Sequence, residues 1–249
     1  MDLNINGRNI LVTGAAKGIG RGIALAAANE GANIVLHYQS SKKEALETVK
    51  EIERHGVQVV LVKGDLASID DVQNMKKDIS QGIGEIDAIV NNAGFAQYKS
   101  FFKYQPGEWK REIDVCLLGV MNLAHTFIPD MMEKKGGKFI NIIGDSARTG
   151  DRNFIISAAA RSGTISFLKS LAQEAGRNNI QCNTVALGLI DQGQSFDPDV
   201  LEKIMKQYPL KRLGNIDDIS GSILFLLSPW SDWITGQVLS INGGHSMLG

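Results

Sequence analysis

The stretch TGAAKGIG, residues 13–20, decides the fold because it places three glycines between an apolar run and a helical pattern. Gly14 permits a tight turn, Gly18 lets the backbone approach a pyrophosphate, and Gly20 lets the helix pack closely on the strand. The amino terminus of that helix would then face the anion. Glycines also mark ordinary strand–helix turns, but this placement favours a dinucleotide-binding turn.

On both sides of this turn, short β-branched apolar runs alternate with helical patterns along the chain. The runs predict strands at 9–14, 33–38, 57–62, 86–92, 138–143, 180–187 and 237–241. The helical patterns lie near 18–29, 41–55, 69–80, 105–134, 152–177 and 216–228. Nearly continuous apolar character is typical of strands that are buried on both faces. The alternation predicts an α/β fold: a single Rossmann-like, doubly wound, seven-stranded parallel sheet flanked by helices.

No linker, repeat or low-complexity segment divides the chain, so residues 1–249 are expected to form one dinucleotide-binding domain. The least regular region is 191–214, a long excursion after the sixth predicted strand, with a short helix near 199–206. Excursions of this length in a compact domain are often functional lids. Because it follows a strand of an α/β sheet, it should hang over the edge where ligands bind.

Composition excludes several classes of function. The 249 residues carry 27 acidic and 26 basic side chains, a net charge of −1, which gives no general attraction to nucleic acid or anionic membrane. The two cysteines, Cys116 and Cys182, are too few for a disulfide framework or zinc knuckle, and the four histidines have no metal-ligand spacing. With no export signal and no apolar run near membrane-span length, we expect a cytoplasmic protein without metal.

Three motifs resemble those of the short-chain dehydrogenase/reductase family. TGAAKGIG matches the family's TGxxxGxG fingerprint, NNAG (91–94) its motif after the fourth strand, and GDL (64–66) its adenine-side segment. The tail 209–244 also resembles the family's last third, so the similarity covers nearly all of the chain. The chain looks most like the single-domain branch that includes β-ketoacyl carrier-protein reductases and hydroxyacyl-CoA dehydrogenases.

The resemblance implies NAD or NADP as cofactor, but the charge selectivity is unclear. Tyr38 stands where NAD-dependent relatives have an acid, and Gln39 where relatives that use the phosphorylated cofactor often have a base. Lys17 either meets a 2′-phosphate or is a solvated loop lysine. We therefore expect NAD(P) binding to be weak or absent. The candidate cofactor-binding residues are Gly14, Lys17, Gly18, Ile19, Gly20, Tyr38, Asp65, Leu66, Asn92, Ala93 and Gly94.

The family's catalytic positions all depart from its pattern. Its Tyr-x-x-x-Lys pair, in which the lysine lowers the pKa of the tyrosine, falls on Ser157 and Arg161. Its serine falls on Gly144, and its helix-four asparagine falls on Cys116. A slipped alignment cannot explain the loss, because no tyrosine occurs between residues 105 and 207.

A serine hydroxyl is a far weaker acid than a phenol, and an arginine cannot exchange a proton. We therefore expect a non-catalytic subunit, a pseudoenzyme that forms a heterotetramer with an active NAD-dependent β-hydroxyacyl-CoA dehydrogenase paralogue, or else a homo-oligomer. In this the chain resembles the non-catalytic subunit of a heteromeric hydroxy-aryl-succinyl-CoA dehydrogenase. Two alternatives stay open: an active NAD(P)-dependent oxidoreductase with a rearranged site that uses Asp145 and Ser146 or Tyr98, and a dinucleotide-sensing binding module.

Overall fold

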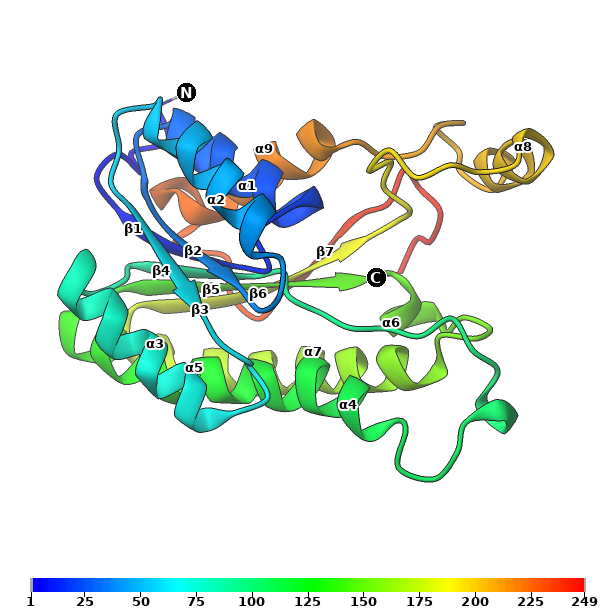
Figure 1. The fold of residues 1–249 in the computed structure, drawn as a ribbon, viewed down its shortest axis with the longest axis horizontal. Helices are drawn as coiled ribbons and strands as arrows, with labels where there is room; N and C mark the ends of the chain where they lie inside the picture. The colour runs from blue at the N-terminus through cyan, green and yellow to red at the C-terminus, as the bar shows by residue number, and fades with distance from the viewer. Residues whose placement is uncertain (1, 249) are drawn as a thin grey trace.

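Seven parallel strands form one sheet in the order β3-β2-β1-β4-β5-β6-β7 (Figure 1). The structure, a computed structural model, describes residues 2–248. The strands are β1 (Asn9–Thr13), β2 (Asn33–Tyr38), β3 (Val59–Lys63), β4 (Ala88–Asn91), β5 (Gly137–Gly144), β6 (Ile180–Leu187) and β7 (Val238–Ile241). The α/β fold class predicted from the sequence, with its seven-stranded parallel sheet, is confirmed.

Nine α-helices accompany these strands in the part of the chain that the structure describes. They are α1 (Gly18–Asn29), α2 (Lys42–Glu53), α3 (Ile69–Gly82), α4 (Lys110–Ile113), α5 (Gly119–Lys134), α6 (Ser146–Thr149), α7 (Ile155–Ala175), α8 (Pro198–Lys206) and α9 (Ile216–Leu227). The helix expected over 105–134 differs in two respects. It begins only at Lys110, because Gly107 takes a positive φ of 91°, and a π-helical turn, Asp114–Leu118, separates α4 from α5.

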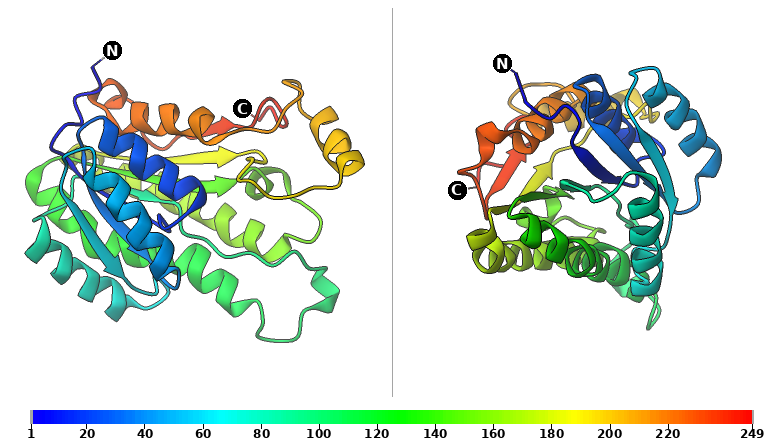
Figure 2. Two further views of the ribbon diagram at one scale, coloured as in Figure 1. Left: turned by 45° about the horizontal axis from the view of Figure 1, so that its top comes forward. Right: turned by 90° about the vertical axis from the view of Figure 1, so that its left-hand side faces the viewer.

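The helices lie in two layers. Helices α1, α2 and α9 cover one face of the sheet, and α3, α5 and α7 cover the other (Figures 1 and 2). Successive side chains of a strand therefore enter different cores: Ile10 and Val12 pack in the α1–α9 core, and Leu11 packs in the α3–α5–α7 core. Burial on both faces explains why the strands are apolar at nearly every position.

One segment, Lys110–Lys134, is long and apolar enough to cross a membrane by length and composition alone. However, 56% of its most apolar window is buried inside the fold. Leu123, Phe127 and Met131 all pack in the core beneath the sheet. The segment therefore has the character of a core helix.

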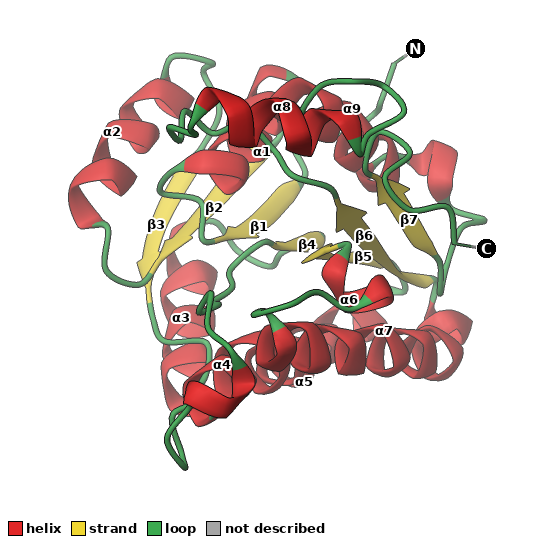
Figure 3. Cartoon of the chain, turned by 90° about the vertical axis from the view of Figure 1, so that its right-hand side faces the viewer, coloured by secondary structure: helices red, strands yellow, loops and turns green. Residues whose placement is uncertain are grey.

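The strand order reverses at β1, which lies between β2 and β4. Thr13 at the end of β1 pairs with Asn91 at the end of β4, so the loops that follow these two strands leave the sheet side by side. Figure 3 looks onto this edge, with α8 on one side of it and α4 and α6 on the other. In a doubly wound sheet this reversal point is where ligands bind.

The excursion 191–214 begins and ends at one point, because Ile190 pairs with Gly214 in an isolated parallel bridge. Its helix α8 has no buried residue, and in Figure 1 it projects beyond the ends of the strands. Asp197 caps α8 through a hydrogen bond to the amide of Asp199, at 2.9 Å. The excursion is thus an ordered surface segment anchored at both ends.

Candidate active site

The turn between β1 and α1 can be made only with glycine at its first position. Gly14 has a φ of 61° and Gly18 a φ of 59°, in the left-handed region that other residues adopt at a cost. A Cβ on Gly14 would stand 3.0 Å from the Cα of Ala93, in the loop after β4. Lys17, the residue before α1, makes no side-chain cap, so the first amides of the helix are available to a ligand.

Thr13 and Asn92 join this turn to the NNAG segment. The Thr13 hydroxyl donates to Asn91 Oδ1 at 2.7 Å and accepts the amides of Asn92 and Ala93 at 3.1 and 3.0 Å. The Asn92 side chain donates to the carbonyl oxygens of Thr13 and Gly14 at 3.2 and 3.1 Å. The two loops therefore form one hydrogen-bonded unit. Thr13 was not identified as a site residue from the sequence. Its position directly before the first glycine of the turn was the only signal that could have identified it.

His37, at the end of β2, holds the other side of the turn and was also missed. Its Nδ1 accepts the amide of Gly14 at 3.2 Å, and its backbone carbonyl accepts the amide of Ala15 at 3.0 Å. Its Nε2 lies 3.1 Å from the carbonyl oxygen of Gly64. Burial lowers the pKa of His37, whereas the bond to Gly64 and the charge of Asp65 raise it.

A cleft of about 590 Å³ opens beside this unit, within the usual size range of ligand pockets. Nine of the eleven predicted cofactor residues line it: Gly14, Lys17, Ile19, Tyr38, Asp65, Leu66, Asn92, Ala93 and Gly94. The other two, Gly18 and Gly20, lie in the turn itself. The glycine turn, the uncapped helix start and the size of the cleft together fit a dinucleotide.

Arg111 is a further residue that lines the cleft and that the sequence did not predict. It donates to Asp65 Oδ2 at 2.6 Å and so joins α4 to the segment after β3. Partial burial opposes ionisation of Asp65, but the hydrogen bonds from Arg111 and Ala67 prevail and lower the pKa of this carboxyl. The guanidinium is thus held at the cleft wall by an ion pair.

Ser157 and Arg161, the two residues of α7 at the family's tyrosine and lysine positions, differ in their access to the cleft. Ser157 is fully buried, and its hydroxyl donates to the carbonyl oxygen of Phe154 at 3.2 Å. The Arg161 guanidinium lies against Gly94, one of the residues that line the cleft. Within residues 2–248 it makes no hydrogen bond or ion pair through its side chain, so its charge is available to a ligand.

A serine hydroxyl lies near Gly144, two residues further along the chain. A Cβ on Gly144 would stand 3.3 Å from the Oγ of Ser146, in the first turn of α6. Asp145 points elsewhere: it is 5% exposed, and its Oδ2 accepts from Asn242 at 2.8 Å and Ser246 at 2.5 Å. Of the two residues proposed for a rearranged site, only Ser146 offers a hydroxyl near the end of β5.

Cys116 lies in the π-helical turn between α4 and α5. Its thiol donates to the carbonyl oxygen of Phe95 at 3.1 Å and lies 3.5 Å from the amide of the same residue. It therefore fixes the loop that follows the NNAG segment. Extra helical residues of this kind often occur at functional sites.

Tyr98, in that same loop, is 73% exposed, and its ring packs edge-on against Phe154 at 5.2 Å. The loop is held to the start of α7 by a bond from the amide of Lys99 to the carbonyl of Asn153, at 2.9 Å. Tyr104 is committed elsewhere: its hydroxyl donates to Glu112 Oε1 at 2.6 Å, and burial together with this bond raises its pKa to about 12. Tyr98 is the tyrosine that lies beside the helix carrying Arg161.

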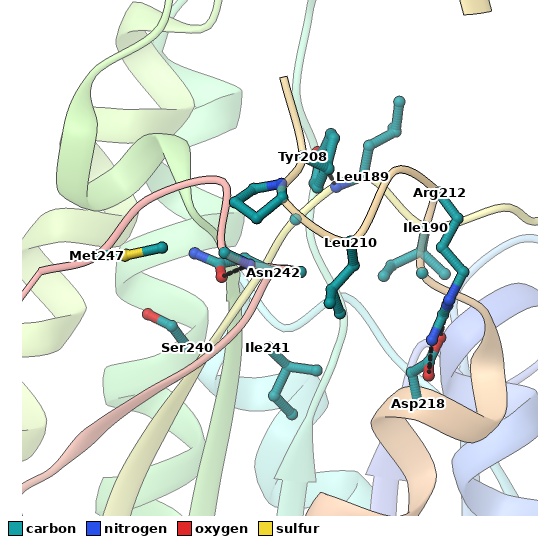
Figure 4. Close-up of a pocket in the computed structure, with 15 residues that line it drawn as sticks. Leu189, Ile190, Tyr208, Leu210, Arg212, Asp218, Ser240, Ile241, Asn242 and Met247 are labelled. Atoms are coloured by element: carbon teal, nitrogen blue, oxygen red, sulfur yellow. Dashed lines mark hydrogen bonds and ion pairs between the residues drawn. The ribbon is translucent and has the colours of Figure 1, made fainter. Parts of the chain in front are cut away.

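A second cavity, of about 470 Å³, lies between the segment after β6, residues 208–214 and the end of β7 (Figure 4). Arg212 pairs with Asp218 across one side of it, at 2.5 and 2.8 Å, and lowers the pKa of that carboxyl to about 2. Leu189 and Ile190 line this cavity, whereas Gln192 lines the glycine cleft. The segment after β6 therefore separates the two.

Comparison with known proteins places this geometry in a family. The family model described as Enoyl-(Acyl carrier protein) reductase, adh_short_C2, matches residues 14–246. The 3-oxoacyl-(acyl-carrier-protein) reductase FabG of Staphylococcus epidermidis is 36% identical over 245 residues, 96% of this chain and 99% of that protein. The chain is a member of the short-chain dehydrogenase/reductase family.

Two further proteins agree with this assignment. The 3-oxoacyl-(acyl-carrier-protein) reductase of a Synechocystis species is 32% identical, over 96% of each chain. A crystal structure from Sinorhizobium meliloti, described as a "putative short-chain alcohol dehydrogenase", superimposes with a TM-score of 0.93 at 28% identity and covers 98% of each chain. The match extends over nearly the whole family fold.

The comparisons contradict the expectation of a non-catalytic subunit. The curated relatives, which match this short-chain dehydrogenase/reductase from end to end, are named as reductases. The expectation was wrong because it treated four departures from the family pattern as a loss of chemistry. Those four departures do not remove every group of the required type: the hydroxyl of Ser146 lies near Gly144, and the guanidinium of Arg161 lies against Gly94, which lines the cleft. Weak or absent cofactor binding also finds no support in the cleft.

Proposed function

We propose that this chain is an active NAD(P)H-dependent reductase that converts a ketone to an alcohol, on a 3-oxoacyl thioester, in the cytoplasm. Its site is a rearranged form of the family's. The observation that carries the proposal is the unpaired guanidinium of Arg161 at Gly94, one of the residues that line a dinucleotide-sized cleft. The names of the relatives support the direction of the reaction and the class of substrate.

The glycine turn and the first amides of α1 would hold the pyrophosphate, and the cleft wall formed by Tyr38, Asp65 and Leu66 would hold the adenosine. When bound, the reduced nicotinamide supplies a hydride to the carbonyl carbon. The chain's own task is then to orient the carbonyl, to stabilise negative charge on its oxygen and to deliver one proton to it.

Ser146 donates a hydrogen bond to the carbonyl oxygen from the end of β5. Arg161 stabilises the charge that develops on that oxygen, because a preorganised cation acts strongly where water is excluded. Arginine cannot itself give up a proton. The phenol of Tyr98 gives its proton to the oxygen, and the phenolate regains one from water through its exposed side. The carbonyl thereby gains one hydride and one proton.

The excursion 191–214 acts as the lid of this site. A side chain at Gly18 would collide with the Oε1 of Gln192, so Gln192 already reaches over the glycine turn. Helix α8 has no buried residue to hold it against the rest of the fold. Movement of α8 about the bridge between Ile190 and Gly214 would admit and enclose a substrate.

The test is turnover by the isolated chain, followed as the loss of NADPH or NADH absorbance with a 3-oxoacyl thioester. Tyr98→Phe should lower kcat by about 10²-fold, as expected for loss of a positioned acid. Phe102→Leu, at a 94% exposed position of the same loop, is the matched control and should leave kcat unchanged. Absence of turnover with both cofactors would contradict the proposal, and equal turnover by Tyr98→Phe would remove Tyr98 from it.

We also infer that the chain assembles with further copies of itself through the edge strand β7. This strand pairs with β6 on one side; Leu239 within it is 40% exposed, and Trp233, five residues before it, is 99% exposed. Exposed edges and apolar patches of this kind favour association. Light scattering on the purified chain should give an oligomer, and Trp233→Asp should shift it toward the monomer. A monomeric wild-type chain that assembles only with a paralogue would refute self-assembly.

A further inference from the structure

His37 connects three segments that meet under the glycine turn. Its side chain is 2% exposed and lies between Gly14, at the end of β1, and Gly64, after β3. Its own backbone carbonyl takes the amide of Ala15. One residue thus holds two consecutive amides of the turn that carries the pyrophosphate site.

The partners of the imidazole dictate its protonation state. A backbone amide can only donate, so Nδ1, which faces Gly14, must be unprotonated. A carbonyl oxygen can only accept, so Nε2, which faces Gly64, must carry the hydrogen. His37 is therefore neutral, with its proton on Nε2, whenever the turn has this geometry.

Protonation of Nδ1 would place two donors face to face in a buried site. The bond to Gly14 would be lost, and the amide of Gly14 would be left without an acceptor, which is costly where water cannot enter. Because Gly14 also contacts the loop after β4, a shift of its peptide would move the NNAG segment as well.

Three charged side chains line the cleft around His37: Asp65, Arg111 and Lys17. Asp65 favours protonation of the imidazole, but it is neutralised in part by Arg111. Burial is the largest influence and lowers the pKa of His37 from its ordinary value of 6.5. As the pH falls below about 6.5, the unfolded chain takes up the proton before the folded chain does, so the free energy of unfolding decreases until the pH passes the folded pKa.

We propose that neutral His37 is the positioning residue for dinucleotide binding, and that its protonation in acid releases the Gly14 turn and weakens that binding. This inference builds on the proposed function, which requires a dinucleotide in the cleft. It assigns the positioning of the glycine turn to His37, one position before Tyr38, which is not part of the family fingerprint.

The experiment measures binding of NADH by fluorescence between pH 8 and about pH 5, because its pyrophosphate does not titrate there. Wild type should bind progressively more weakly toward the acid end, by up to about tenfold once His37 is protonated, which corresponds to the loss of about one buried hydrogen bond. In His37→Asn, Oδ1 replaces Nδ1 as acceptor and cannot be protonated, so binding should change by less than about threefold over the same range. His37→Leu lacks any acceptor and should bind weakly at every pH.

His55→Asn is the matched control, because His55 is exposed and distant from the cleft in sequence, and its pH profile should equal that of wild type. Equal profiles for wild type and His37→Asn, or tighter wild-type binding in acid, would overturn the inference. Hydrogen exchange of the peptide 13–20 in the ligand-free chain gives a second readout. It should rise in acid relative to His37→Asn at the same pH, and no difference would overturn the inference even if NADH failed to bind. Failure of NADH to bind at pH 8 would count against the proposed function instead.

Discussion

The glycine turn and the start of α7 lie at the two ends of one site, but they are built differently. At the glycine turn, the amides of Gly14 and Ala15 and the carbonyl of Gly14 all have partners from other segments. At the start of α7, the hydroxyl of Ser157 is committed to the backbone of its own helix, while Arg161 is left unpaired against Gly94.

This difference explains why one end of the site matches its family residue by residue and the other does not. Where the backbone binds the ligand, the fold requires particular conformations, and only glycine satisfies them at low cost. Where side chains perform the chemistry, a hydroxyl or a cation can come from a neighbouring position. From the sequence, this second possibility stayed open as an alternative, but inactivity was favoured over it.

The largest effect should come from filling the glycine turn. Gly14→Val puts a β-branched residue at a φ of 61° and pushes its Cβ against Ala93, so dinucleotide binding should weaken by at least about 100-fold. Gly56→Val is the matched control: its φ is 74° and no atom lies within 4 Å of the added Cβ, so it pays a similar backbone cost far from the cleft. Titration with NADH measures the affinity of both variants. Equal losses of affinity would show that the conformation of the Gly14 turn is not specifically required for binding.

The next largest effect should come from the unpaired cation. Arg161→Met keeps the length of the side chain and removes its charge, so kcat/KM should fall by about 10²-fold, the scale of a lost charge-stabilising donor. Arg161→Lys should recover part of this loss, because an ammonium restores the charge without the planar fork. If Arg161→Met had the kcat/KM of wild type, the charge of Arg161 would have no part in the reaction. The contrast between a backbone site at the glycine turn and a side-chain site at α7 would then lose its support.

The sequence predicted the sheet, most helix boundaries and the cleft residues, because apolar periodicity and glycine spacing report directly on the backbone. It failed where a long-range contact decides the outcome. The acceptor role of His37 depends on Gly14, 23 positions away, and the approach of Ser146 to Gly144 depends on the short helix α6. Neither contact leaves a periodic signal. The π-helical turn at Asp114–Leu118 was not predicted either, and Cys116 within it bonds to a residue 21 positions earlier.

A smaller effect tests whether Ser146 replaces the family's serine. Ser146→Ala should lower kcat/KM by about tenfold, since one neutral hydrogen bond to substrate is lost. Adding Gly144→Ser to that variant should restore most of the rate, because the new hydroxyl occupies the space that Ser146 vacates. Steady-state kinetics of the single and double variants decide this. A double variant no faster than Ser146→Ala would mean that the two positions are not equivalent.

The smallest effect on turnover is expected at Asp145, although it adjoins both Gly144 and Ser146. Its Oδ2 takes hydrogen bonds from Asn242 and Ser246, so it fastens the C-terminal tail to the end of β5 and does not face the glycine cleft. Asp145→Ala should lower the free energy of unfolding by about 1–3 kcal/mol, because buried donors lose their acceptor. It should leave kcat/KM within about threefold of wild type, a change of under 1 kcal/mol in the barrier. Urea unfolding and initial rates on the same preparation measure the two quantities. A large loss of rate with unchanged stability would place this carboxyl in the chemistry, and the rearranged site would then extend toward the tail.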